Sequence, residues 1–311
     1  MKTSASLRIE FCGIELSSPV INGSGTYDAI ASRRIFGDEA FESKTFPFAA
    51  FVSKTITENP RAGNPPNRIW ETPAGMINSI GLPNPGLDGF VEDHLPILAE
   101  LPVPLIVSVM AETPEGFTRL VERIEETGLA SALELNVSCP NVHSGLIVGE
   151  QPTETEQLMK HLKGRTELPL IVKLTPNVAS PEEVAAAAEA GGADAVSLIN
   201  TIKATAIDPV SGSPAIGAGS GGLSGPAVRP VALQQVRAIR SRVSIPVIGM
   251  GGVTDGESAL EFLRAGASLV AVGTENFRDP AAGRRIESEL GTELSRRGFD
   301  SIGDVCDRPS S

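Results

Sequence analysis

Eight short apolar runs recur along this chain of 311 residues, and a segment of helical character follows most of them. Most of these runs are continuously apolar, which is typical of parallel strands that are covered on both faces. The alternation predicts an α/β fold, a (β/α)8 TIM barrel, in preference to an open doubly wound sheet. The expected strands are residues 19–22, 51–54, 104–109, 132–136, 170–174, 195–199, 246–249 and 269–272.

Three of the expected helices carry start signals. Thr113 and Ser180 each place a hydroxyl at the N-cap position, and a proline and an acidic residue follow. Asp255 begins a third helix in a similar way. The alanine-rich stretch 184–190 runs into Gly191 and a second glycine, which predicts a C-cap there.

Long stretches separate some of the strands. Residues 23–50, 57–88 and 201–229 are expected to be loop insertions around the carboxyl-end mouth of the barrel. No linker-like composition divides the chain, so residues 1–311 are expected to form a single domain. Only the segment 300–311 is expected to be a weakly packed tail.

Charge and hydropathy narrow the class of protein. The net charge of −12 and the lack of a basic tract argue against nucleic acid as a partner. No apolar run approaches the roughly 18 residues of a membrane span, and the N-terminus does not resemble a signal peptide. We therefore expect a cytoplasmic protein with no membrane segment.

Cysteine and histidine usage argues against metal sites. The three cysteines are odd in number and far apart, so neither a disulfide framework nor a four-thiolate metal or iron-sulfur site is expected. The histidines show no metal-ligand spacing. These residues are Cys12, Cys139 and Cys306, and His94, His143 and His161.

Polar residues stand at or near the ends of five expected strands: Asn22, Lys54, Asn136, Lys173 and Asn200. Because active sites of barrels lie at the carboxyl ends of the strands, these residues predict a shared polar mouth. A lysine inside the barrel is costly to bury unless it meets an anion or an electron-rich ring, so Lys173 and Lys54 indicate a bound cofactor. The alternative is an internal salt bridge, for Lys173 with an acid such as Glu134.

Glycine-rich segments follow the last two strands. The run from Gly249 to Gly252 and the pair Gly273-Thr274 lie where barrels commonly bind a phosphate group on backbone N–H groups. Tight turns are the alternative, and the spacing of a Rossmann fingerprint is absent. Residues 78–86 combine amides with glycines and prolines, which favours a loop that faces the substrate.

Cys139 stands between Asn136 and Asn141, beside a proline that cannot continue a regular strand. The thiol is therefore expected in a loop over the mouth, although a lone cysteine is more often a small core residue. A nucleophile and a general base both remain open for Cys139 on the residues alone.

Together these segments resemble the dihydroorotate dehydrogenases, from residue 21 to about residue 277. A cysteine in the catalytic loop is similar to the class 1 enzymes, and residues 141–149 look most like the NAD-linked class 1B branch. The motifs that carry the resemblance are Asn22-Gly-Ser-Gly-Thr26, Ser53-Lys-Thr55, Pro60-Arg-Ala-Gly-Asn64, Asn78-Ser-Ile-Gly-Leu82, Asn136-Val-Ser-Cys-Pro-Asn141, Gly221-Gly-Leu-Ser-Gly-Pro226, Gly249-Met-Gly-Gly252 and Gly273-Thr274.

The resemblance implies one FMN per chain and oxidation of (S)-dihydroorotate to orotate in de novo pyrimidine (UMP) biosynthesis. Cys139 would be the general base that takes the C5 proton, while a hydride leaves C6 for the flavin. The implied substrate-binding residues are Lys54, Asn78, Ser79, Ile80, Gly81, Leu82, Asn136, Asn141, Asn200 and Thr201. The implied FMN-binding residues are Ser24, Lys54, Thr55, Ser108, Asn136, Lys173, Ile199, Gly225, Gly251, Gly252, Gly273 and Thr274.

Three places in the chain depart from the family pattern, and one of them is Pro66-Asn67, which alters a usual Pro-Arg segment. Ser108 stands where the family commonly has an asparagine near the flavin, so that contact is expected to be shorter or lost. Pro83 replaces a usual glutamine.

The route of the electrons is implied by the resemblance as well. The chain has no Rossmann motif and too few cysteines for a cluster, so NAD⁺ reduction would require a partner subunit with FAD and a 2Fe-2S cluster. A homodimer flanked by two such subunits, a heterotetramer, is expected. The alternatives are a dihydrouracil or dihydrothymine dehydrogenase and, more distantly, a non-redox phosphate-binding barrel.

Overall fold

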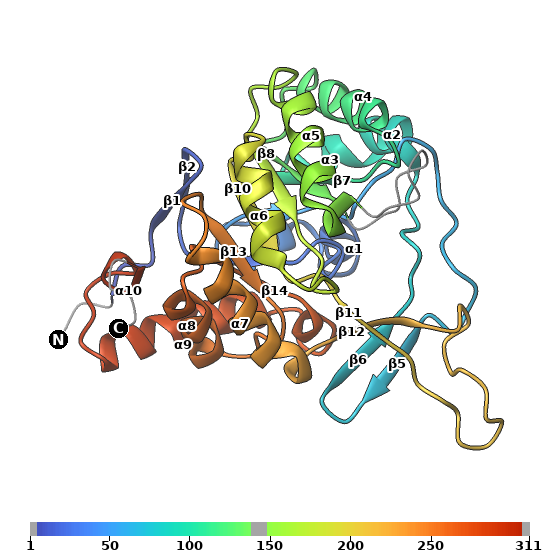
Figure 1. The fold of residues 1–311 in the computed structure, drawn as a ribbon. Coiled ribbons are helices and arrows are strands. Elements are labelled where there is room, and N and C mark those ends of the chain that lie inside the picture. Colours follow the sequence, from blue (N-terminus) through green and yellow to red (C-terminus); the bar gives the residue numbers. More distant parts are fainter. Residues whose placement is uncertain (1–4, 138–147, 307–311) are drawn as a thin grey trace.

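The computed structural model describes residues 5–137 and 148–306. Eight parallel strands form one sheet in the order β3-β14-β13-β10-β9-β8-β7-β4, which curls into a barrel (Figure 1). The eight predicted strands are confirmed, each within two residues at either end. They are β3 (Val20–Asn22), β4 (Phe51–Val52), β7 (Leu105–Val109), β8 (Ala132–Asn136), β9 (Leu170–Lys173), β10 (Ala195–Leu198), β13 (Val247–Met250) and β14 (Leu269–Val272).

The barrel closes between β3 and β4 with the help of one side chain. The Ala49 N–H donates to the Val20 carbonyl over 3.0 Å. Above this bond the amide of Asn22 replaces a strand neighbour: its Nδ2 donates to the Val52 carbonyl and its Oδ1 accepts from the Val52 N–H, each over 2.8 Å. The expectation that Asn22 belongs to the polar mouth is therefore wrong, because its amide is fully buried in the ladder.

Helices surround the barrel (Figure 1). Those between successive strands from β7 onward, and after β14, are α4 (Pro114–Glu125), α5 (Pro152–Lys163), α6 (Pro181–Ala190), α7 (Arg229–Arg240), α8 (Gly256–Ala265) and α9 (Ala282–Arg296). The stretch from β3 to β7 adds α1 (Ala29–Phe36), the 3-10 turn η1 (Asp38–Phe41), α2 (Gly86–Gly89), the π-helical turn η2 (Phe90–His94) and α3 (Leu95–Leu98).

The helix starts agree with the sequence in two of three cases. Thr113 accepts a hydrogen bond from the Gly116 N–H over 3.1 Å, and Asp255 forms a reciprocal capping box with Ser258. Helix α6 also begins after Ser180, but the Ser180 side chain makes no capping hydrogen bond, so that part of the prediction is wrong.

A second sheet lies outside the barrel, at the lower right of Figure 1. It is antiparallel, with the order β11-β12-β6-β5, and it is built from β5 (Ile69–Thr72), β6 (Gly75–Asn78), β11 (Ile202–Ala204) and β12 (Gly221–Ser224). The insertions at 57–88 and 201–229 thus pair with each other, which the sequence did not predict. Further elements are the hairpin β1 (Ile9–Phe11) and β2 (Ile14–Leu16), and the 3-10 turns η3 (Val148–Glu150), η4 (Pro226–Val228) and η5 (Thr274–Phe277).

Alternate residues of each barrel strand face the barrel axis or the helices. One apolar cluster joins the inward residues Ile106, Ile171 and Ile248 to Phe11 and Leu16 of the β1–β2 hairpin. A larger cluster fills the layer between the strands and the helices. The barrel is thus filled by side chains in its lower half, and the site lies above this filling.

The C-terminal segment is better packed than expected where the structure describes it. Ile302 and Val305, beside and within the short helix α10 (Gly303–Cys306), are 2% and 4% exposed and belong to the main core. Residues 300–306 are therefore not a loose tail, and residues 307–311 lie outside the described part. Among residues 5–137 and 148–306, no helix has the length and apolar character needed to cross a bilayer.

Candidate active site

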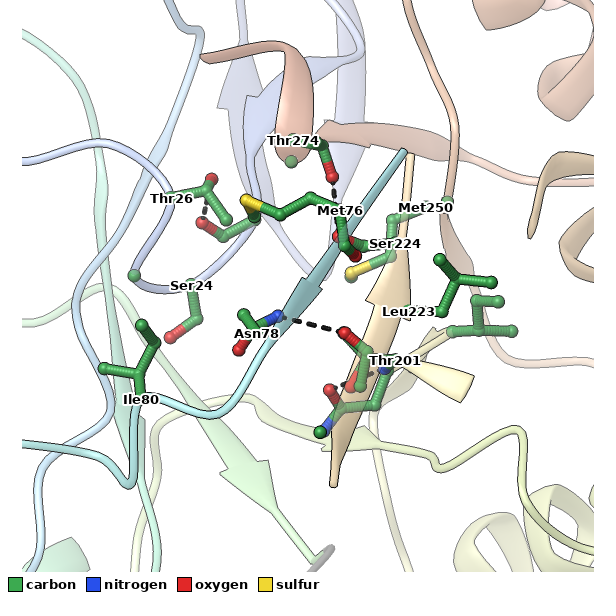
Figure 2. A pocket seen from close by; sticks show the side chains of 18 of the residues that line it. Ser24, Thr26, Met76, Asn78, Ile80, Thr201, Leu223, Ser224, Met250 and Thr274 are labelled. Atoms are coloured by element: carbon green, nitrogen blue, oxygen red, sulfur yellow. Dashed lines mark hydrogen bonds between the residues drawn. The ribbon is translucent and has the colours of Figure 1, made fainter. Parts of the chain in front are cut away.

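A cavity of about 520 Å³ lies at the carboxyl ends of the barrel strands, beneath the antiparallel sheet. Residues at the ends of β8 and β9, such as Asn136 and Lys173, form part of its wall. Met76, Asn78 and Ser224 enter the cavity from the second sheet (Figure 2). The site lies at the mouth of the barrel, as the sequence predicts, and the second sheet, which the sequence does not predict, encloses it from the other side.

The floor of the cavity is a layer of buried polar side chains. Going up the strands, the inward positions change from Ile106, Ala132, Ile171 and Ala195 to Ser108, Glu134, Lys173 and Ser197. The Glu134 carboxylate accepts hydrogen bonds from the hydroxyls of Ser108 (3.2 Å) and Ser197 (3.0 Å). The Lys173 ammonium lies 3.8 Å from Glu134 and also lines the cavity.

Lys173 thus combines the two roles that the sequence left as alternatives. Its side chain is 9% exposed and that of Glu134 is 3% exposed, so the ion pair is almost wholly removed from water. Lys173 nevertheless contributes to the cavity wall, where its ammonium can meet a ligand. The internal salt bridge and a ligand contact are therefore compatible.

Ser108 does not reach the cavity. Its side chain is fully buried and bonds to Thr55 Oγ1 over 2.9 Å and to Glu134, while Thr55 and Ser24, whose hydroxyls lie 3.1 Å apart, line the cavity in front of it. Ser108 was counted among the cofactor-binding residues with a contact expected to be shorter or lost, and the structure places it behind the residues that could make such a contact.

Lys54 lies in the wall beyond β4 and has a favourable position for an anion. Gly25, at φ +71°, leaves room for it: a Cβ at this position would lie 2.9 Å from Lys54 Nζ. Burial, and then the nearby charge of Lys173, lower the pKa of Lys54. Two neighbouring cations, of which only Lys173 is seen to pair with a carboxylate, leave this part of the cavity suited to a negatively charged group.

Amides gather on the side of the second sheet. Asn78 on β6 pairs with Gly222 on β12, and its Nδ2 donates to the Gly222 carbonyl over 3.4 Å. A Cβ on Gly222 would collide with the side chain of Thr201, so a glycine is required between Asn78 and Thr201. The Asn200 Oδ1 accepts from the Thr201 N–H over 2.8 Å, which fixes the start of this segment. Asn78 and Thr201 are both visible in Figure 2.

Glycine loops form another part of the wall, after β13 and β14. Gly251 and Gly252 have φ of +125° and +81°, and a Cβ on Gly252 would lie 2.8 Å from the Gly225 carbonyl. Close approach of bare backbone is what a phosphate group needs. Next to them, Thr274 donates to the Ser224 hydroxyl over 2.8 Å (Figure 2). The cavity therefore suits a ligand that carries both an anionic group and a flat polar ring.

The predicted residues come together almost without exception. Those that line this cavity are Ser24, Lys54, Thr55, Asn78, Ser79, Ile80, Gly81, Leu82, Asn136, Lys173, Ile199, Asn200, Thr201, Gly225, Gly251, Gly252, Gly273 and Thr274. Ser108 is the described exception. Cys139 and Asn141 fall outside the residues that the structure describes, so their roles stay predictions.

The sequence missed several lining residues. Gly25, Thr26 and Ser224 lie inside motifs that were recognised, and their neighbours there were chosen instead. Met76 and Met250 also line the cavity, but a methionine beside other apolar residues carries no signal that separates a cavity wall from a core.

Comparisons with known proteins identify the family of this chain. The family model described as dihydroorotate dehydrogenase matches residues 6–294. A protein of Desulforudis audaxviator named dihydroorotate dehydrogenase B (NAD(+)), catalytic subunit, is 44% identical over 299 residues, 96% of this chain and 95% of that protein. Proteins of the same name from Geobacter metallireducens (42% over 301 residues, 96% of each chain) and Listeria monocytogenes (41% over 303 residues, 96% and 97%) are similar. With its barrel, its cavity and these relatives, the chain belongs to the dihydroorotate dehydrogenase family.

Proposed function

We propose that this chain catalyses the flavin-dependent oxidation of (S)-dihydroorotate to orotate in pyrimidine biosynthesis, with FMN as the flavin. The observation that carries the proposal is a single cavity lined by the buried Lys173, the half-buried Lys54, a group of amides and two glycine loops. These features match an anionic, flat, imide-like substrate beside a cofactor that bears a phosphate group.

The described residues fit FMN. The bare backbone of Gly251, Gly252 and Gly273 would hold the phosphate group, together with the Thr274 hydroxyl. Lys173 and Ile199, which also line the cavity, would contact the ring. When bound, the flavin supplies the acceptor for the hydride that leaves C6 of the substrate.

The substrate would be held by charge and by amides. Lys54 would bind the carboxylate, and Asn78, Asn136, Asn200 and Thr201 would orient the ring through its polar edges. Unpaired edges would penalise ligands that lack the matching groups. Cys139, placed by sequence in the loop after β8, would take the C5 proton as general base, and Asn141 would complete the substrate contacts.

Electrons would leave through another protein. The names of the relatives specify NAD(+) and a catalytic subunit, which implies a partner electron-transfer subunit for those proteins. For this chain we propose NAD⁺ as final acceptor, reached through a partner that carries FAD and a 2Fe-2S cluster. The assembly would be a cytoplasmic heterotetramer around a homodimer of this chain.

An absorbance experiment tests the catalytic proposal. Purified protein should show a flavin spectrum that bleaches anaerobically when dihydroorotate is added, and Cys139→Ser should bleach far more slowly at neutral pH. Dihydrouracil should not bleach the protein. A colourless protein would support the non-redox barrel, bleaching by dihydrouracil alone would support the other pyrimidine dehydrogenase, and equal rates for parent and Cys139→Ser would disprove the base assignment.

A second experiment tests the route of the electrons. The chain expressed alone should oxidise dihydroorotate with an artificial acceptor but should not reduce NAD⁺ efficiently. Efficient NAD⁺ reduction by the isolated chain would refute the partner subunit.

A further inference from the structure

One guanidinium contacts the chain just after each of the two glycine segments. Arg285 on α9 donates through Nη1 to the Thr254 carbonyl over 3.0 Å, and Thr254 lies two residues after Gly252. Its Nη2 donates to Glu275 Oε1 over 3.2 Å, and Glu275 directly follows Thr274. Arg285 therefore links the loop after β13 to the segment after β14.

The same guanidinium is itself fixed in place. Its Nε donates to Asp279 over 3.1 Å, and Nη1 also contacts Glu289 on the next turn of α9 over 3.3 Å. Glu289 in turn accepts from the N–H of Gly256, the first residue of α8, over 2.8 Å. A planar guanidinium with several donors can hold such a set of acceptors, which a lysine ammonium cannot reproduce.

The phosphate group that FMN would bring depends on these loops more than on any charge. Of the described residues that line the cavity, only Lys54 and Lys173 carry a formal charge. Neither of their strands, β4 and β9, neighbours β13 or β14 in the barrel. The affinity for a phosphate group must then come mainly from convergent backbone N–H groups, which bind well only if the two loops keep their relative position.

Arg285 also compensates the charge of Glu275. The Glu275 side chain is 11% exposed and stands one residue from Thr274. Without Arg285 its described cationic neighbour is Arg278, which is 76% exposed and 3.5 Å away. An uncompensated carboxylate at this place would repel a phosphate dianion.

We infer that Arg285 is a positioning residue for the phosphate end of the cofactor site, acting through the loops at Gly252 and Thr274. The inference rests on the proposed function, since it needs FMN as the ligand. It separates the contribution of the phosphate group from that of the ring: Arg285 should matter for FMN and not for riboflavin, which lacks the phosphate group.

The test compares the dissociation constants of FMN and riboflavin for flavin-free protein, measured by quenching of flavin fluorescence. Arg285→Met should raise the dissociation constant of FMN by about tenfold or more. Losses of this size are typical when a residue that orients a metal ligand, without touching the metal itself, is replaced. Riboflavin affinity should stay within about twofold of the parent, since the ring contacts are untouched. Arg285→Lys, which keeps the charge, should fall between parent and Arg285→Met and covers the case in which Arg285→Met does not fold.

Arg278→Met is the matched control, because Arg278 also contacts Glu275 but from the surface. It should leave both constants unchanged. Equal weakening of FMN and riboflavin by Arg285→Met, or unchanged FMN affinity in both Arg285 variants, would overturn the inference while the proposed function stands. A parent protein that binds neither flavin would refute the proposed function and this inference with it.

Discussion

Replacing Lys173 by methionine should reveal the cost of an uncompensated carboxylate inside the barrel. Methionine fills a similar volume, so the cavity term is small. The Glu134 side chain, 3% exposed, keeps its hydrogen bonds from Ser108 and Ser197 but loses the ammonium at 3.8 Å. Removing one partner of a buried ion pair costs about 3–5 kcal/mol, so Lys173→Met should lower the free energy of unfolding by about that amount.

A double variant tests whether the uncompensated charge of Glu134 causes the loss of stability in Lys173→Met. Lys173→Met with Glu134→Gln removes both charges, and the glutamine amide can still accept from one serine hydroxyl and donate to the other. Its free energy of unfolding should return to within about 1–2 kcal/mol of the parent, so that adding Glu134→Gln recovers about 1–4 kcal/mol of the loss. The measurement is urea unfolding of the flavin-free protein followed by circular dichroism.

A surface ion pair provides the control. Lys163 lies 2.8 Å from Asp194, closer than the buried pair, but the two side chains are 48% and 32% exposed. Lys163→Met should therefore cost no more than about 1 kcal/mol. If the Glu134→Gln substitution destabilised the Lys173→Met protein further, the argument from an uncompensated buried charge would be refuted.

Three further outcomes follow from the site and the fold. Orotate affinity should fall as the pH rises through the lowered pKa of Lys54, hence below the ordinary 10.5 of a lysine, because only the ammonium binds a carboxylate; titration of Lys54→Met, which should lack this step, separates it from ionisation of the ligand. Gly222→Ala should lower the melting temperature and weaken orotate, since a Cβ there collides with a threonine across the sheet, whereas Gly164→Ala, where a Cβ meets nothing within 4 Å, should do neither; equal melting temperatures for the two would contradict the packing argument. Thr113→Ala should cost about 1 kcal/mol of stability as a lost N-cap, while Ser180→Ala should be close to neutral in the same urea experiment, because only the first side chain caps its helix.

The barrel strands could be predicted because strands that are buried on both faces have apolar residues at consecutive positions. β7 and β8 are buried at every position, and a strand covered on both faces reads as an uninterrupted apolar run. The polar residues at the strand ends were found for the same reason, since each interrupts such a run. Lys54, Asn136, Lys173 and Asn200 consequently appear together in the cavity wall.

The rest depends on contacts between distant parts of the chain. Asn22 carries the same local signal as Asn136, but its amide turns toward β4 and replaces a missing ladder partner. The second sheet is invisible in sequence because its strands are three or four residues long and glycine-rich β12 pairs with β6 across 144 residues, from Gly222 to Asn78. Ser108 looks like a cavity residue by its place on β7, yet Thr55 stands between it and the cavity.

The close packing at Gly222 makes the two insertions, residues 57–88 and 201–229, depend on each other. Asn78 comes from the first and Thr201 from the start of the second, while the parallel ladder of the barrel takes no part in their pairing. The residues that select the ligand on this side can therefore change without loss of stability in the barrel. Because a Cβ at Gly222 in the second insertion would collide with Thr201, however, β12 can stay paired with β6 only if this position remains a glycine, and we expect the two insertions to vary together.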